Sequence, residues 1–203
     1  MDLASLLLEV QVISASGALA PGPLTFATIG CGGKGGFKEG LKVALGHMAV
    51  EFPLVLLLSL GLLYFLQLKE VKASIYLLGS AFLVYFAASQ FRSKPDGGGY
   101  RTENPFLIGA SLSIFNPYFL MWWLAIGSVL LVDATSLLGL VGIPLVYLSH
   151  VWMDFAWLAI LAHLGHLGRK LGRWFRYVNV ALGVALLYFA FVFLTDFIRL
   201  VGG

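Results

Sequence analysis

The chain has 203 residues, of which 60% are hydrophobic and 11% are charged, and its formal net charge is +3. A water-soluble domain carries about 25% charged residues because its surface must face water, so this composition excludes a soluble globular protein and predicts an exterior that contacts lipid. The small positive charge is typical of a membrane protein with basic cytoplasmic loops and requires neither nucleic acid nor another acidic partner.

The first predicted element begins at the N-terminus. Residues 3–20 are apolar and end in small side chains, as a cleaved signal peptide does. A signal peptide opens with a positively charged region, whereas the first basic residue here is Lys34. We therefore expect this segment to persist as part of the first transmembrane helix.

Six apolar runs are close to the roughly 20 residues that a helix needs to cross a bilayer. They are too long and too uniformly apolar for the alternating strands of a β-barrel, so we predict an all-α membrane protein. The predicted spans are Leu3–Ile29, Leu41–Leu66, Ser74–Gln90, Phe106–Val132, Leu137–His163 and Tyr177–Leu200. Glycine, proline and charged residues predict connections at 32–36, 69–70, 95–99 and 133–135.

The basic residues indicate how the spans are oriented. Three of the 13 Lys and Arg residues, Lys69, Lys72 and Arg199, lie on one side of the predicted membrane. The other ten lie in the first, third and fifth connections: Lys34, Lys38, Lys42, Arg92, Lys94, Arg101, Arg169, Lys170, Arg173 and Arg176. Short loops rich in Lys and Arg stay in the cytoplasm. We therefore expect a multi-pass protein of the cell membrane with both termini outside.

The two halves of the chain share three features in the same order. Spans two and five carry a His, a carboxylate four residues later and then Phe; spans three and six carry Leu-Gly followed by Tyr-Phe-Ala; spans one and four are interrupted by proline. Chance similarity between short apolar motifs is the alternative, which the preserved order disfavours. Because each half has three spans, the halves would cross the membrane in opposite senses, as in many secondary transporters. We predict one membrane domain of two inverted repeats, 1–90 and 106–203, joined by a cytoplasmic linker, 91–105.

Two carboxylates lie near the middle of predicted spans, Glu51 in the second and Asp154 in the fifth. A charged group in the hydrocarbon region is costly and faces the bundle interior or water. A histidine four residues earlier shares the same helix face, so His47, Glu51, His150 and Asp154 would line one cavity if the two faces meet. Such groups can carry protons in an antiporter or bind a divalent transition metal. Alternatively, each histidine only pairs with its own carboxylate and holds two helices together.

The prolines in spans one and four predict local unwinding, because proline removes a backbone hydrogen bond and clashes with the preceding turn. The helix N-terminus after such a break offers N–H groups to an anion such as an amino-acid carboxylate. An ordinary kink is the alternative, but breaks in corresponding spans point to a site. Hydroxyl groups nearby belong to Ser14, Ser16, Thr25 and Thr28. The predicted substrate-binding or coupling residues are Pro21, Gly22, Pro23, Thr25, His47, Glu51, Asn116, Pro117, His150 and Asp154.

Other motifs narrow the function. No phosphate-binding loop, nucleophile elbow or zinc-protease signature occurs, so we expect neither an enzyme nor a cofactor. Cys31 is the only cysteine, which excludes an internal disulfide and a Cys-x-x-Cys pair. Trp122 and Trp123 either line a cavity or anchor a helix at the lipid interface, and the sequence leaves both interpretations open.

The stretch Gly17–Pro23, the glycine-rich loop after it, Gly46-His47 and Asn116-Pro117 together resemble the LysE/RhtB family of amino-acid exporters over nearly the whole chain. The resemblance implies secondary active efflux of amino acids or similar small metabolites, driven by a proton or membrane-potential gradient, and a three-plus-three architecture. The positions that it carries over are Pro21, Gly22, Pro23, Glu51, Asn116, Pro117 and Asp154.

The wider superfamily is also similar to cadmium and nickel exporters and to a membrane thiol-relay protein. The relay needs paired cysteines, and Cys31 stands alone. Divalent-metal export through His47, Glu51, His150 and Asp154 remains the alternative function, although the loop 92–103 lacks histidine. The expected partners are a small-molecule substrate, a coupling proton or ion and the lipid bilayer, without nucleic acid. The small apolar body is compatible with a homodimer.

Overall fold

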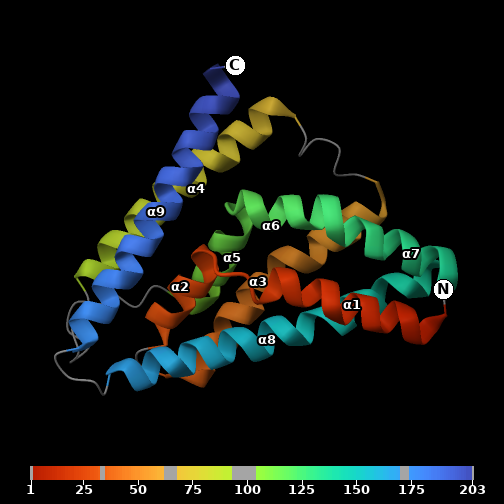
Figure 1. Cartoon of the computed structure of the whole chain (residues 1–203), viewed down its shortest axis with the longest axis horizontal. Coiled ribbons are helices and arrows are strands. Elements are labelled where there is room, and N and C mark those ends of the chain that lie inside the picture. Colours follow the sequence, from red (N-terminus) through yellow and green to blue (C-terminus); the bar gives the residue numbers. More distant parts are fainter. Residues whose placement is uncertain (1, 33–34, 62–67, 93–103, 170–173, 203) are drawn as a thin grey trace.

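The computed structural model describes residues 2–32, 35–61, 68–92, 104–169 and 174–202, and every regular element within these ranges is a helix (Figure 1). The first half contains α1 (Leu3–Ala18), α2 (Pro23–Cys31), α3 (Phe37–Ser59) and α4 (Lys69–Phe91). The second half contains α5 (Pro105–Ile114), α6 (Pro117–Trp122), a π-helical segment (Trp123–Gly127), α7 (Ser128–Leu138), a 3-10 turn (Gly139–Val141), α8 (Gly142–Arg169) and α9 (Trp174–Gly202).

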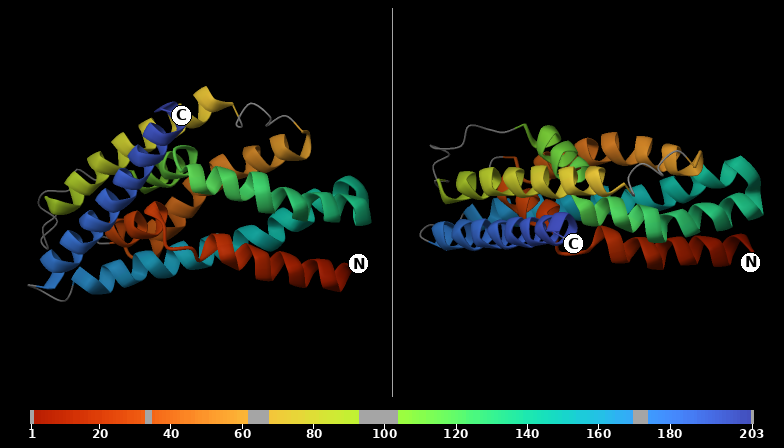
Figure 2. Two further views of the ribbon diagram at one scale, coloured as in Figure 1. Left: turned by 45° about the horizontal axis from the view of Figure 1, so that its top comes forward. Right: turned by 90° about the horizontal axis from the view of Figure 1, so that it is seen from above.

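Several of these helices are long and apolar enough to cross a membrane. Among the described residues they are α3, the helical run Pro117–Gly168 and the stretch Val180–Gly202, with the bent pair α1–α2 as a fourth candidate. The run Pro117–Gly168 reverses direction between α7 and α8 (Figures 1 and 2). Gly139 lies at this turn with φ +63°, a conformation that glycine adopts without steric cost. The chain is therefore a multi-pass membrane protein.

Helical structure is interrupted just before Pro23 and just before Pro117. α1 ends at Ala18 and α2 begins at Pro23, and the two axes are bent by 72°. α5 ends at Ile114, and the side chain of Asn116 accepts hydrogen bonds from the N–H groups of Tyr118 and Phe119 at the start of α6. In both cases a proline occupies the first turn of the following helix, where its missing N–H leaves no bond unmade.

Two predicted connections are wrong. Residues 133–135 lie inside α7, where the Thr135 hydroxyl donates to the carbonyl of Leu131 at 2.8 Å, so polar side chains that suggested a loop are accommodated by the helix itself. The chain turns instead at Gly139. Lys69 and Glu70 form the first turn of α4, where an acidic side chain complements the helix dipole. The second span begins at Phe37, before the predicted Leu41. The predicted connection 95–99 and most of the linker 91–105 lie outside the described residues.

Glycines set the closest contacts between helices. A Cβ atom on Gly46 of α3 would lie 1.9 Å from the carbonyl oxygen of Phe106, and one on Gly109 of α5 would lie 2.0 Å from that of Val43. On the other side of α3, a Cβ on Gly40 would lie 2.3 Å from the carbonyl oxygen of Leu158 in α8. Small residues permit such backbone contact between membrane helices. α3 is thereby held between α5 and α8.

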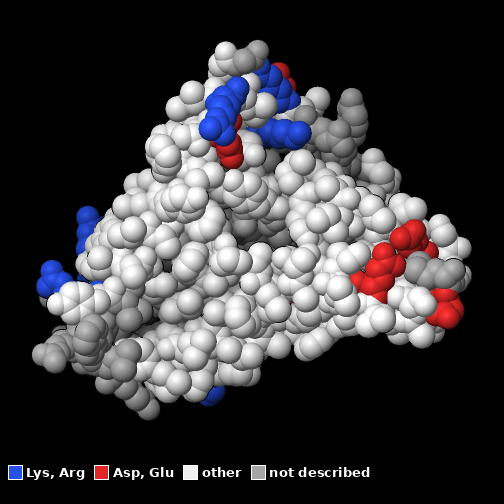
Figure 3. Space-filling model, in the orientation of Figure 1, with Lys and Arg blue, Asp and Glu red and all other residues white. Residues whose placement is uncertain are grey.

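The exterior is apolar over most of its area. Leu8, Leu148 and Phe191 are each about two-thirds exposed, as expected of side chains that face lipid. On the face drawn in Figure 3, charged residues lie at the edges of the molecule, and acidic groups gather at the end that contains the start of α1 and α7. α4 and α9 lie side by side along their lengths (Figures 1 and 2). They pack against the end of the bundle that contains α2 and α5.

Candidate functional site

A cavity of about 300 Å³ lies at the two helix breaks. Nine of the ten predicted site residues line it; the tenth, Pro117, borders a smaller cavity beside α4. The polar lining of the larger cavity comes from Ser16, Thr25, His47, Glu51, Ser113, Asn116, Tyr118, His150 and Asp154. Large apolar walls come from Leu24, Leu112, Phe119, Trp122, Trp123, Leu158 and Phe189. The cavity thus joins residues from both halves of the chain.

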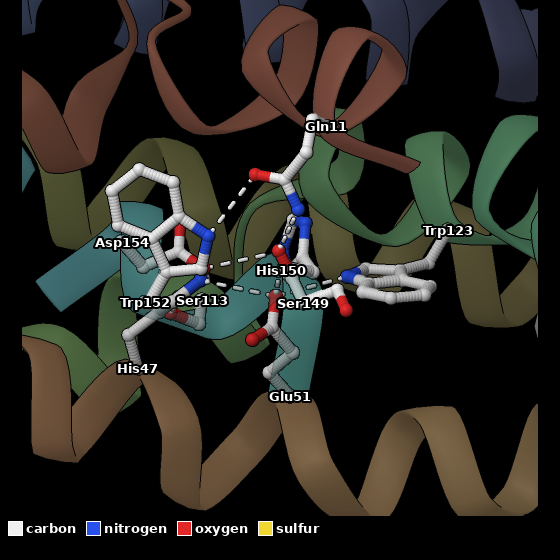
Figure 4. A network of polar contacts seen from close by, with 9 residues as sticks. All are labelled: Gln11, His47, Glu51, Ser113, Trp123, Ser149, His150, Trp152 and Asp154. Carbon is white, nitrogen blue, oxygen red and sulfur yellow. Dashed lines mark hydrogen bonds and ion pairs between the residues drawn. The ribbon is translucent and has the colours of Figure 1, made fainter. Parts of the chain in front are cut away.

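The four acidic and histidine residues of α3 and α8 meet at this cavity (Figure 4), and none of them is more than 5% exposed. The Nε2 atom of His150 lies 3.1 Å from Oε1 of Glu51 and 3.2 Å from Oδ2 of Asp154. The Nε2 atom of His47 lies 3.3 Å from the same Glu51 oxygen. His150 therefore stands between carboxylates of two helices and does not simply pair with the carboxylate of its own helix.

The protonation of His47 follows from its contact with Ser113. The Ser113 hydroxyl donates its single proton to the carbonyl of Gly109 at 2.7 Å. It must then accept from Nδ1 of His47, which lies 2.6 Å away. In neutral His47 the remaining nitrogen, Nε2, carries a lone pair directed at a Glu51 oxygen. Because two lone pairs at this distance repel each other, one proton must lie between His47 and Glu51.

Buried carboxylate oxygens in this cluster still lack hydrogen-bond donors. Glu51 Oε1 accepts from Trp123 Nε1 at 3.0 Å and from His150 Nε2. Its second oxygen, Oε2, has no hydrogen-bond partner among the described residues, and neither has Oδ2 of Asp154. Nε2 of His150 lies between Oε1 of Glu51 and Oδ2 of Asp154, at 3.1 and 3.2 Å, and can donate its one proton to only one of them at a time. A buried acceptor without a donor costs about 1–3 kcal/mol, more when it is charged, so both oxygens favour an incoming proton or cation.

The two tryptophans form an aromatic wall of the cavity, which decides between the two interpretations that the sequence left open. The Trp122 ring stacks on His150 with centroids 5.7 Å apart, and the Trp123 ring meets the same histidine edge-on at 5.1 Å. Trp123 is 1% exposed. Its ring lies across Gly127, where a Cβ atom would be 2.2 Å from Cε3 of the indole. The π-helical segment between these residues therefore shapes the wall.

The broken ends contribute backbone groups as well as side chains. Gly22 is the extended N-cap of α2, and no side chain caps this helix. The Thr25 hydroxyl donates to the carbonyl of Ala20 at 3.0 Å, across the break. Thr28 donates to the carbonyl of Leu24 within α2. Of the two serines expected before the break, Ser16 lines the cavity, whereas the buried Ser14 does not.

A second polar contact joins α1 to α8 beside His150 (Figure 4). The Gln11 side chain donates to the carbonyl oxygen of Ser149 at 2.7 Å and accepts from Nε1 of Trp152 at 3.1 Å. These residues were not predicted, and neither were the roles of Ser113 and Phe189. A signal existed for Phe189, because it belongs to the Tyr-Phe-Ala motif that marks the repeat.

Comparisons with known proteins assign the chain to a family. Residues 15–197 match the model of the LysE type translocator family. A curated relative, the chemotactic transduction protein ChpE of Pseudomonas aeruginosa, is 31% identical over 125 residues, which cover 58% of this chain and 62% of the relative. The matched region thus spans about three fifths of that relative's length. No solved structure gives a significant match.

Proposed function

The chain belongs to the LysE type translocator family, and on that premise we propose that it is a secondary active exporter of amino acids or similar small metabolites, coupled to a proton or ion gradient. Members of this family are membrane transporters rather than enzymes. The observation that carries the finer proposal is the cluster in which His150 lies within 3.2 Å of both Glu51 and Asp154. This cluster is buried at a cavity formed by two broken helices.

The proposal includes six spans arranged as two inverted repeats. The first repeat, 1–90, would contain α1–α2, α3 and α4, and the second, 106–203, would contain α5–α7, α8 and α9, with 91–105 as a cytoplasmic linker. The packing supports this pairing, because α5 contacts α3 as α1 contacts α8, and α4 contacts α9. Both breaks also face the same cavity. The site would then lie near the bilayer midplane, as in other inverted-repeat transporters.

Coupling would arise from competition for the same oxygens. A cationic group of the substrate and a proton both neutralise a buried carboxylate, and the free oxygens of Glu51 and Asp154 can accept either. When the substrate leaves, a proton takes its place, so the two carboxylates are never both negatively charged and without a bound cation inside the apolar bundle. An exporter built in this way returns protons as it releases substrate.

Efflux from proteoliposomes tests the exporter. We expect vesicles that contain the purified chain, loaded with labelled amino acids, to release them faster when the outside is made acidic than at equal pH on both sides. The double variant Glu51→Gln/Asp154→Asn should release them no faster than empty vesicles. Equal efflux from the wild type with and without the pH difference would refute proton coupling, and efflux from the double variant would refute this site.

A specific observation also supports the alternative function, divalent-metal export. His47, Glu51 and Asp154 can each offer one ligand atom, and these atoms lie within 4.8 Å of one another. Mixed imidazole and carboxylate ligands suit metals such as Ni²⁺, Zn²⁺ or Cd²⁺. Under this alternative the metal is the substrate. Thermal stabilisation by one of these ions, lost in His47→Gln, together with metal efflux from vesicles, would favour it over metabolite export.

The proposed orientation places both termini outside the cell membrane. In a Cys31→Ala background, a cysteine replacing Asp2 or Gly202 should react with a membrane-impermeant maleimide in intact cells. A cysteine replacing Lys38, an exposed residue at the start of α3, should react only after permeabilisation. The reverse pattern would invert the topology and contradict the distribution of basic residues.

A further inference from the structure

We infer that the cavity holds its substrate as a zwitterion, the ammonium group on the free oxygens of Glu51 and Asp154 and the carboxylate on the free N–H groups of α2, with an apolar side chain against the remaining walls. This inference rests on the proposed function and names the substrate class of its site, an α-amino acid with an apolar side chain.

The carboxylate of the substrate is assigned to the start of α2, a helix of nine residues. Pro23 has no N–H, and Phe26 donates its N–H to the carbonyl of Gly22. The N–H groups of Leu24 and Thr25 precede that first intrahelical bond, and no side chain caps them. Because Thr25 directs its hydroxyl to Ala20, that hydroxyl is occupied elsewhere. Two backbone donors at the positive end of a helix dipole form a carboxylate site.

An independent observation assigns the ammonium group of the substrate to Glu51 and Asp154. Glu51 and Asp154 line the same cavity as α2. Oε2 of Glu51 and Oδ2 of Asp154 are buried and have no hydrogen-bond partner among the described residues, although Oδ2 lies 3.2 Å from Nε2 of His150. Trp122 and Trp123 line the cavity next to them, and aromatic faces attract cations. An ammonium group supplies the missing donors and neutralises the carboxylates in one step.

The rest of the lining decides the side-chain class. Leu112, Phe119, Leu158 and Phe189 form an apolar wall. The polar lining residues outside the two charged ends are uncharged: Ser16, Ser113, Asn116 and Tyr118. Within the part of the chain that the structure describes, the lining contains no Lys or Arg that could pair with an acidic substrate, and its carboxylates are Glu51 and Asp154 alone. The volume of about 300 Å³ lies at the small end of the range for ligand pockets and suits one amino acid better than a peptide.

Gly22 provides a variant in which stability and binding should move in opposite directions. Its backbone is extended, at φ −140° and ψ −177°, and a Cβ atom there would meet no protein atom within 4 Å. In Gly22→Ser the new hydroxyl caps α2 by accepting from the N–H groups assigned to the substrate carboxylate. We expect a higher melting temperature and about tenfold weaker binding. Gly22→Ala adds similar bulk without a capping oxygen and serves as the matched control, with a smaller loss of binding.

The ligand test uses the purified full-length chain in detergent, with leucine, isopentylamine, 4-methylpentanoate, lysine and glutamate as probes. We expect leucine to raise the melting temperature by binding the folded state, and the amine and the acid, which each lack one charged end, to bind at least about tenfold more weakly. Leucine stabilisation should be lost in Glu51→Gln and reduced in Gly22→Ser.

Each contrary result would overturn a different part of this inference. Equal binding of isopentylamine and leucine would remove the carboxylate site on α2. Binding of lysine or glutamate in place of leucine would overturn the apolar class and leave the exporter standing. Failure of all amino acids, with no gradient-driven efflux of any of them, would overturn the proposed function as well.

Discussion

Replacing Glu51 with glutamine should abolish transport while the protein still folds. Glutamine has nearly the same shape, and its Oε1 can still accept from Trp123 Nε1 and His150 Nε2, so these two helix contacts are preserved. The contact with His47 Nε2, which requires a shared proton, is weakened. What it loses is the charge that attracts a proton or ammonium group. We expect the initial rate of efflux from proteoliposomes to fall at least about 100-fold, which corresponds to roughly 2.7 kcal/mol of transition-state stabilisation.

Glu51→Leu is the informative contrast, because leucine removes the shared acceptor as well as the charge. Nitrogens of two buried side chains, His47 and Trp123, then lack their oxygen, at a cost of about 1–3 kcal/mol each, whereas His150 keeps Oδ2 of Asp154 at 3.2 Å. We expect this variant to express poorly or melt earlier, whereas Glu51→Gln melts near the wild type. Wild-type transport by Glu51→Gln would show that the cluster is structural.

Adding a single methyl group at Gly46 should separate α3 from α5. The new Cβ would lie 1.9 Å from the carbonyl oxygen of Phe106, a backbone atom that can retreat only if the helix moves. Overpacking a close contact typically costs 1–3 kcal/mol, and a backbone clash lies at or above the upper end. We expect Gly46→Ala to lower the free energy of unfolding by about 3 kcal/mol, measured as loss of melting temperature and of the folded fraction in detergent.

Gly168→Ala is a matched control, since it makes the same change in helix α8 where a Cβ would meet no atom within 4 Å. Alanine is the better helix former by up to about 1 kcal/mol, so this variant should melt at or above the wild-type temperature. Gly109→Ala alters the same crossing from α5 and should resemble Gly46→Ala. Unchanged melting of Gly46→Ala would mean that the crossing is looser than the structure indicates.

The meeting of the two polar faces illustrates what could be predicted from sequence. The spacing of His47 to Glu51 and of His150 to Asp154 puts each pair on one helix face, and the cost of charge in an apolar span turns that face inward. The sequence did not indicate that His150 would reach across to Glu51. That contact depends on the rotation and separation of α3 and α8, which are set by backbone contacts such as that of Gly40 with Leu158.

The residues that were missed have side chains with two possible roles. A serine in an apolar helix usually bonds to its own preceding turn, as Ser113 does to Gly109, and its second contact with His47 appears only when α3 lies alongside. Trp123 was named from the sequence, but a tryptophan in an apolar span can line a cavity or face lipid, and only the packing decides between the two. Conversely, the polarity of Asp133 and Thr135 predicts a loop, although α7 continues through them to Leu138 and is capped by Gly139.

The π-helical segment Trp123–Gly127 has a consequence for comparing this chain with its relatives. Such a segment accommodates one residue more than a regular helix of the same rise, and one residue corresponds to a rotation of about 100°. Deleting a residue from a regular helix would turn everything after it by that angle. Deleting Ala125 would instead remove the extra residue, so that the segment becomes a regular α-helix and Leu130, Leu131 and Ala134 stay on the buried face of α7. A one-residue gap at this place in an alignment then marks the loss of the π-helical turn, and family members that carry it should keep the same inward-facing positions in α7.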